Sequence, residues 1–153
     1  MGTDNPKSAQ SFPDSSNILR FRALIVDDYP QFQEMLASSL GTLHQIKEMD
    51  FANSGESAIA KAEAAHYDLI FLDVMMPTGI DGYETCARLR DNPAYKKTPI
   101  VMVSGNDSPF DEVKGIVSGC TTYVTKPIQI EAFLQLSNRV LNWLEFHNNM
   151  NTV

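Results

Sequence analysis

Short apolar runs alternate with amphipathic segments along most of the chain. Three runs of four apolar residues, a short run rich in β-branched and aromatic residues, and one imperfectly alternating segment predict strands. These strands cover residues 23–26, 45–51, 69–72, 100–103 and 122–124. Unbroken apolar runs are typical of buried strands in a parallel sheet, whereas the alternation over 45–51 favours an edge strand.

Between these runs, apolar residues recur at helical spacing. The spacing predicts helices over about 30–40, 56–65, 83–90, 109–118 and 130–146. Strand therefore alternates with helix five times, and each crossover between parallel strands must return right-handed over the sheet. We predict an α/β fold, a doubly wound five-stranded parallel sheet with helices on both faces.

The chain has 153 residues, which suits one domain. Residues 1–20 contain prolines and serines and are expected to form a disordered leader, followed by the folded domain over 21–146 and a short C-terminal tail over 147–153. We expect the function of such a chain to depend on the surface of this one domain, because there is little room for a second domain.

Charge and cysteine content narrow the classes of partner. Twelve Lys and Arg against nineteen Asp and Glu give a formal net charge of −7, which disfavours attraction to nucleic acid or anionic lipid. No apolar stretch reaches the length of a membrane helix, so no membrane insertion is expected. The two cysteines, Cys86 and Cys120, lack metal-binding spacing and suit packing in a reducing cytoplasm.

Polar side chains follow four of the predicted strands at the point where each strand ends. They are the pair Asp27-Asp28, then Asp73, Ser104 and Lys126. In an open α/β sheet the functional crevice lies beyond the carboxyl ends of the strands. We therefore expect three carboxylates, a hydroxyl and an amine to lie close together there.

This set of groups predicts a metal-dependent phosphoryl acceptor. A carboxylate can form a labile acyl phosphate, and Asp73 is the candidate acceptor. Three carboxylates need a cation, and Mg²⁺ (or Mn²⁺) suits direct ligation by Asp28 and Asp73 with Asp27 acting through water. Ser104 and Lys126 could contact the phosphoryl oxygens, and Pro127 could form a tight turn, cis or trans, that directs the lysine amine. Taken singly, each of these residues is more often a helix cap, a turn residue or a solvated charge, and only their joint placement at the strand ends favours the site.

Taken together, residues 21–146 resemble the receiver domain of two-component response regulators, of the single-domain kind similar to chemotaxis regulators. The resemblance rests on Leu24-Ile25-Val26-Asp27-Asp28, Leu69 to Pro77, Asp81-Gly82, Val103-Ser104-Gly105 and Tyr123 to Pro127. It implies a flavodoxin-like strand order 2-1-3-4-5 and transfer of a phosphoryl group to Asp73 from the phosphohistidine of a separate partner. That partner would be a sensor histidine kinase or a histidine phosphotransfer protein. The resemblance also implies Mg²⁺ dependence and self-catalysed dephosphorylation.

The same resemblance assigns further roles. The backbone carbonyl of Met75 would bind the metal. Tyr123 would be a switch aromatic that packs inward when Ser104 moves toward the phosphoryl group, although an ordinary strand aromatic is the alternative. The output face would comprise the helix near 109–118, the strand 122–124 and the last helix. This face would bind a downstream protein target, and a phosphorylation-dependent homodimer is left open.

One departure from the family pattern lies in the loop after Asp73. The family usually has two residues between the loop proline and the Asp-Gly pair, whereas Thr78-Gly79-Ile80 gives three. We expect the extra residue to bulge the loop, which bears on kinase specificity and metal affinity.

Two other functions compete with this interpretation. A phosphorylation-independent receiver-like binding module would need none of the reactive side chains, yet all are present. A haloacid-dehalogenase-like phosphatase, which also forms an aspartyl phosphate, would want a second acid two residues after the nucleophile, where Met75 stands. We therefore expect a signalling protein that catalyses only its own phosphotransfer and dephosphorylation, and not an enzyme acting on external substrates.

Overall fold

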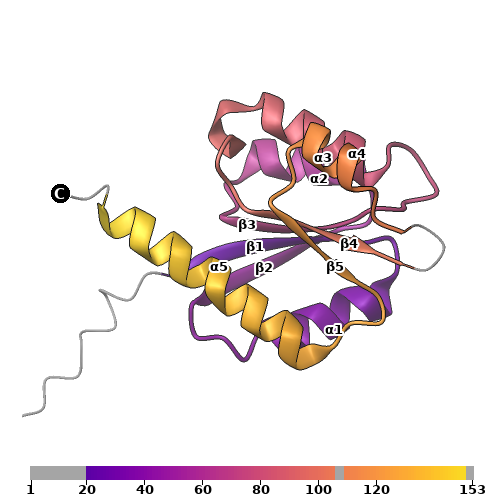
Figure 1. The fold of residues 1–153 in the computed structure, drawn as a ribbon. Coiled ribbons are helices and arrows are strands. Elements are labelled where there is room, and N and C mark those ends of the chain that lie inside the picture. The colour runs from indigo at the N-terminus through magenta and orange to yellow at the C-terminus, as the bar shows by residue number, and fades with distance from the viewer. Residues whose placement is uncertain (1–19, 106–108, 151–153) are drawn as a thin grey trace, which may run out of the picture.

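The computed structural model describes residues 20–105 and 109–150, and within them the chain forms one five-stranded sheet (Figure 1). All neighbouring strands are parallel, in the order β2-β1-β3-β4-β5. The strands are β1 (Phe21–Val26), β2 (Ile46–Ala52), β3 (Leu69–Asp73), β4 (Ile100–Ser104) and β5 (Thr122–Thr125). The predicted fold, strand order and edge position of the second strand are confirmed. The expected leader lies outside the described residues, apart from Arg20.

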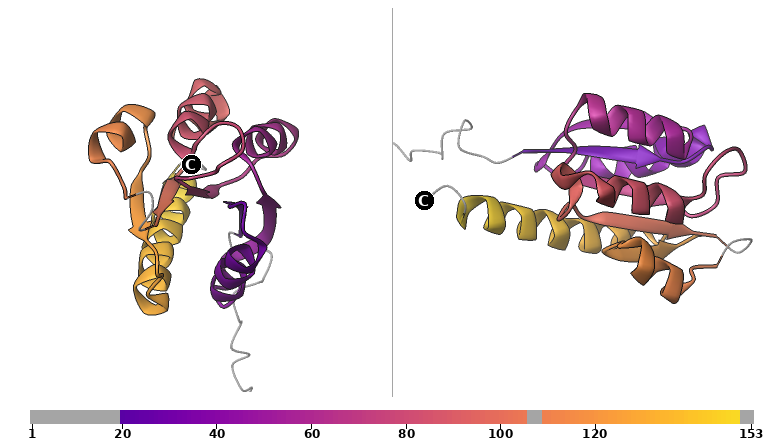
Figure 2. Two further views of the ribbon diagram at one scale, coloured as in Figure 1. Left: turned by 90° about the vertical axis from the view of Figure 1, so that its right-hand side faces the viewer. Right: turned by 90° about the horizontal axis from the view of Figure 1, so that it is seen from above.

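In the described part of the chain, five α-helices connect and follow the strands. They are α1 (Pro30–Leu40), α2 (Gly55–Ala64), α3 (Gly82–Asp91), α4 (Glu112–Ser118) and α5 (Ile130–Met150). A short 3₁₀ helix, η2 (Pro93–Tyr95), follows α3. Helices α2, α3 and α4 cover one face of the sheet, and α1 and α5 cover the other (Figures 1 and 2).

The core has two layers because successive side chains of a strand point to opposite faces. In β3, Ile70 and Leu72 pack with α2 and α3, while Phe71 packs with α1 and α5. Every residue of β3 and β4 is buried, including the polar residues at their carboxyl ends. The apolar runs therefore form the central strands and hold the functional edge of the sheet in place.

Two helix boundaries differ from the prediction. Helix α4 begins at Glu112 and not near residue 109, because the Asp111 side chain accepts hydrogen bonds from the backbone N–H groups of the first turn and caps the helix there. Helix α5 continues to Met150, so the segment assigned to a tail begins as helix. Its last turns are supported by contact between the rings of Trp143 and His147, whose centroids lie 3.9 Å apart.

Arg90, at the end of α3, joins three segments at the amino-terminal edge of the sheet. Its guanidinium donates to the backbone carbonyls of Gly119, Tyr95 and Thr98 over 2.5–2.9 Å. Gly119 ends α4 with a left-handed φ of 87°, which glycine adopts without steric cost. The carboxyl ends of α3 and α4 are thus tied to each other and to the start of β4.

Candidate functional site

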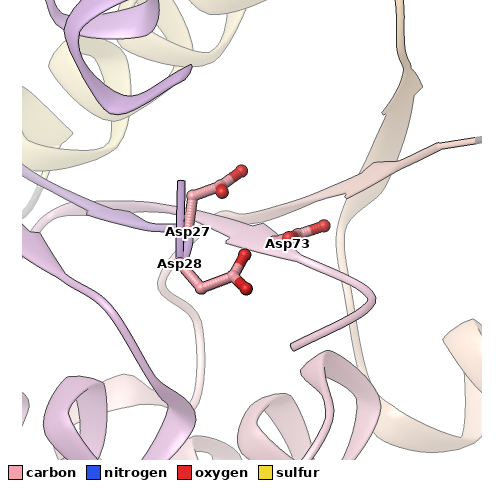
Figure 3. Close-up of side chains that lie close together, drawn as sticks. All are labelled: Asp27, Asp28 and Asp73. Atoms are coloured by element: carbon pink, nitrogen blue, oxygen red, sulfur yellow. The ribbon is translucent and has the colours of Figure 1, made fainter. Parts of the chain in front are cut away.

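Three carboxylates meet at the carboxyl ends of β1 and β3 (Figure 3). Asp27 and Asp28 follow β1, and Asp73 is the last residue of β3; these strands are adjacent and pair in register. One carboxylate oxygen from each residue lies within 4.8 Å of the others. Asp27 and Asp73 are buried whereas Asp28 is exposed, so the cluster is open to solvent on the Asp28 side.

Lys126 brings a positive charge into this cluster. Its Nζ lies 3.1 Å from Asp27 Oδ2 and 3.8 Å from Asp73 Oδ1. The same ammonium lies 4.0 Å from the centroid of the Phe32 ring, a favourable cation–π distance. Lys126 follows β5, and the peptide bond to Pro127 is cis. One lysine against three carboxylates leaves the site formally negative.

Burial of this excess negative charge changes the protonation of the acids. Burial, with the neighbouring Asp27 charge, raises the pKa of Asp73 to about 7, although Lys126 and the Met75 N–H oppose the shift. Burial also raises the pKa of Asp27, against the hydrogen bond from the Tyr29 N–H and the charge of Lys126. The positive charge of Lys126 alone therefore does not balance the three carboxylates, and a divalent cation bound by oxygen ligands would supply the missing positive charge.

Ser104 ends β4 beside the acceptor strand. Val103 pairs with Asp73 in the sheet, so Ser104 stands one residue farther along. Its buried hydroxyl lies 3.5 Å from the carbonyl oxygen of Val124, which is too long for a strong hydrogen bond. Among the residues that the structure describes, a Cβ added at Gly105 would meet only the Lys126 side chain, at 3.8 Å.

The loop after Asp73 is held by contacts with α2 and with the end of β3. The backbone N–H of Ile80 donates to Glu56 Oε1 over 2.9 Å, and this hydrogen bond lowers the pKa of Glu56. Gly79 has a φ of 86°, and a Cβ there would lie 2.4 Å from the Glu56 carboxylate. A Cβ at Gly82 would lie 2.2 Å from the Asp73 carbonyl oxygen. The extra residue in the Thr78-Gly79-Ile80 segment is thus accommodated by a turn at Gly79, and this turn is hydrogen-bonded to Glu56 of α2.

Met75 lies at the start of this loop. Its side chain is half exposed, and its backbone N–H donates to the Asp73 carboxylate. This contact places the Met75 backbone directly beside the acceptor. Its carbonyl remains a predicted metal ligand.

Tyr123 lies in β5, and its side chain faces outward. Its side chain is 40 % exposed. Its ring stacks on Phe110, with centroids 4.0 Å apart, and Phe110 in turn contacts Tyr83. The predicted switch tyrosine therefore occupies an outward position in this structure.

Sequence reasoning missed two residues of α1 that support the site. Gln33 Nε2 donates to the backbone carbonyl of Asp27 over 2.6 Å and to that of Ala52 over 3.2 Å, joining the ends of β1 and β2. Phe32 supplies the ring beneath Lys126 but was assigned only to the apolar stripe of its helix. The sequence feature that could have identified both residues is their position in the first turn of α1, just after the Asp27-Asp28 pair.

Comparisons with known proteins agree with this architecture. The family model described as the response regulator receiver domain matches residues 23–138. The chain is 45 % identical over 83 residues to Protein PilG of Pseudomonas aeruginosa, covering 54 % of this chain and 61 % of PilG. It is 36 % identical over 110 residues to the transcriptional regulatory protein TcrA of Mycobacterium tuberculosis, covering 72 % of this chain and 42 % of TcrA. It therefore spans less than two thirds of either relative.

Among solved structures, the chemotaxis protein CheY4 of Vibrio cholerae is similar, with a TM-score of 0.71 and 33 % identity. That match covers 79 % of this chain and 98 % of the CheY4 chain. Within residues 20–105 and 109–150, no helix is long and apolar enough to cross a membrane. From the matched family model and the shared fold, we conclude that this chain belongs to the family of response regulator receiver domains, the signalling domains of two-component systems.

Proposed function

We propose that the chain accepts a phosphoryl group on Asp73 from the phosphohistidine of a sensor histidine kinase or a histidine phosphotransfer protein. The observation that carries this proposal is a buried carboxylate at a strand end, with two further acids and a lysine amine beside it. The cytoplasm is the compartment we propose, because both cysteines are free thiols.

The proposed cofactor is Mg²⁺, or Mn²⁺ in its place. Asp28 and Asp73 would be direct ligands, the Met75 carbonyl a third, and Asp27 would act through water. The raised pKa of Asp73 supports the fit, since the site as built holds more negative charge than Lys126 balances. When bound, the ion would neutralise charge shared by the acceptor and the incoming phosphoryl group.

In the proposed transfer, a carboxylate oxygen of Asp73 forms the new O–P bond while the P–N bond to the donor imidazole breaks. The imidazole nitrogen keeps the electron pair of that bond. Lys126 Nζ, already 3.8 Å from Asp73 Oδ1, would contact a phosphoryl oxygen of the product. The Ser104 hydroxyl, weakly engaged by Val124, would be free to donate a second hydrogen bond.

The arrangement favours a phosphoacceptor over both alternatives. A phosphorylation-independent binding module would leave the convergence of Asp27, Asp73 and Lys126 without a role. A haloacid-dehalogenase-like phosphatase acting on external substrates would want an acid two residues after Asp73, and the half-exposed Met75 stands at that position.

Metal-dependent labelling tests the proposal. Incubation with acetyl phosphate and Mg²⁺ should add one phosphoryl group, measured by intact-mass spectrometry, because the cation lets an anionic donor approach the carboxylates. The same incubation with excess EDTA should add none. Equal labelling with and without the metal, or no labelling under either condition, would contradict the proposal.

We also propose that phosphorylation is relayed through Ser104 to Tyr123 and so to the face formed by α4, β5 and α5, where a downstream protein would bind. Movement of Ser104 toward the phosphoryl group would open space for the Tyr123 ring and end its stacking on Phe110. Aromatic NMR resonances of Tyr123 should therefore shift on phosphorylation, while those of the buried Tyr95, at the other end of the sheet, should not. Unchanged Tyr123 resonances on a fully phosphorylated chain would remove it from the switch.

A further inference from the structure

A long groove lies between the C-terminal half of α5 and the amino-terminal edge of the sheet. Its main hollow has a volume of about 830 Å³ and lies beside the starts of β4 and β5. A second hollow of about 500 Å³ adjoins it and shares Lys96, Lys97, Trp143 and His147 with it. We call these two hollows the α5 groove. Helix α5 lines the groove from Leu136 to Asn148, a length of about 18 Å at 1.5 Å per residue.

The α5 groove is basic although the chain is acidic. Lys96, Lys97 and Arg139 line it, and all three are exposed. The one acid in the described lining, Asp68, lies beside the His66 ring and accepts a hydrogen bond from the Arg22 backbone N–H. None of the three lining cations forms an ion pair within the part of the chain that the structure describes. Arg90 also lines the groove, but its guanidinium is engaged by backbone carbonyls. Three such cations together, on a chain of net charge −7, indicate a site for a negatively charged group.

The surface between these cations is apolar. Trp143, the chain's single tryptophan, is 43 % exposed and has the His147 ring against it. Leu136, Val140 and Pro99 continue the apolar lining along the main hollow. A concave apolar surface with charged residues at its edge is typical of a site that receives a large side chain and excludes water around it.

We infer that the α5 groove binds an acidic segment of a partner protein, with an apolar side chain of that segment against Trp143. The two hollows together exceed the range of about 300–1,000 Å³ typical of small-molecule sites. The groove's length matches about five or six residues of extended chain. Acidic side chains along such a segment would pair with Lys96, Lys97 and Arg139.

This groove lies at the opposite end of the molecule from the acceptor site. In Figures 1 and 2 the C-terminal half of α5 is far from the loop between β3 and α3. Pro99 in the groove is four residues before Val103, the sheet partner of Asp73, which corresponds to about 13 Å along the strand. A segment bound here would leave Asp73 accessible, so its binding does not depend on the proposed phosphorylation.

Selection from a displayed library of random, tryptophan-free decapeptides tests the inference. We expect the selected peptides to be enriched in Asp and Glu around one aromatic or aliphatic residue. Binding of the synthesised peptides should change the fluorescence of Trp143, the only tryptophan, and should weaken as salt is raised. Charge reversal at Lys96, Lys97 and Arg139 together should weaken binding at least about tenfold.

The matched control reverses three exposed cations outside the groove, at Lys47, Lys61 and Arg88, and so has the same net charge. It should bind the peptides as the wild type does, and Asp73→Asn should also bind unchanged, which separates this inference from the phosphoacceptor proposal. Circular dichroism should show all variants folded. Selection of neutral or basic peptides, or binding equally weakened by both triple variants, would overturn the inference. So would tighter binding of ATP or of phosphatidylglycerol vesicles than of acidic peptides through the same three cations.

Discussion

Asp73→Asn is expected to abolish phosphoryl incorporation under conditions in which the wild-type chain takes up one group. The amide lacks the nucleophilic carboxylate oxygen that forms the acyl phosphate, and it also removes a proposed metal ligand. Because aspartate and asparagine side chains have nearly the same shape, the buried position beside Asp27 and Lys126 should be retained. Intact-mass spectra after acetyl phosphate and Mg²⁺ treatment measure the difference directly.

Two further variants test whether the loss of labelling is specific to Asp73. Asp68→Asn, at an acid that lies before β3 and outside the cluster, should label as the wild type does. Asp28→Asn should label more slowly but still reach one group at high Mg²⁺, because it weakens metal binding and leaves the acceptor intact. Full labelling of Asp73→Asn would show that another residue is the acceptor.

The metal-free chain should lose stability as the pH rises from about 4 to about 7, because of Asp73. The pKa of this carboxyl is about 7 in the folded state against an ordinary value of 3.8, so the folded chain holds a proton here that the unfolded chain has released. The stabilisation is fully present below pH 3.8 and is lost as the pH passes through about 7. About three pKa units correspond to about 4 kcal/mol.

Asp73→Asn isolates this contribution. In EDTA the variant should equal the wild type near pH 4 and exceed it at pH 8 by a few kcal/mol in the free energy of unfolding, measured by urea denaturation. Asp91→Asn, at an exposed acid ending α3, serves as the control and should follow the wild-type curve. Added Mg²⁺ at pH 8 should stabilise the wild type much more than Asp73→Asn. Parallel pH dependence of the wild type and Asp73→Asn would show that Asp73 ionises normally.

The central part of the site could be predicted because its residues lie at the carboxyl ends of predicted strands. Asp27, Asp73 and Ser104 end apolar runs, and the carboxyl ends of parallel strands share one edge of a sheet. The positions of these residues therefore needed only the strand boundaries. Their protonation needed the structure, since the pKa of Asp73 depends on its burial and on the distance to Lys126 Nζ.

Residues that act through long-range contacts could not be predicted in this way. Glu56 contacts Ile80 from 24 positions earlier in the chain, and nothing in its own neighbourhood distinguishes it from an ordinary acid in the first turn of a helix. Gln33 likewise looks like a solvent-facing helix residue until the ends of β1 and β2 are placed beside it. The spacing predicted a helix from about residue 109, whereas the Asp111 side chain caps α4 and its first residue is Glu112.

The hydrogen bond from Arg90 to the Gly119 carbonyl determines how α4 can move. Its carboxyl end is anchored through that arginine, whereas Val113, Ile116 and Val117 leave much of its surface without packing partners in the described structure. Displacement of α4 should consequently be a swing about a hinge at residue 119, and it would have to break the hydrogen bond from the Asp111 N–H to the Tyr83 hydroxyl at the other end of the helix. A lever of this kind would convert a small shift of one hydroxyl into a reorientation of the whole exposed aliphatic surface.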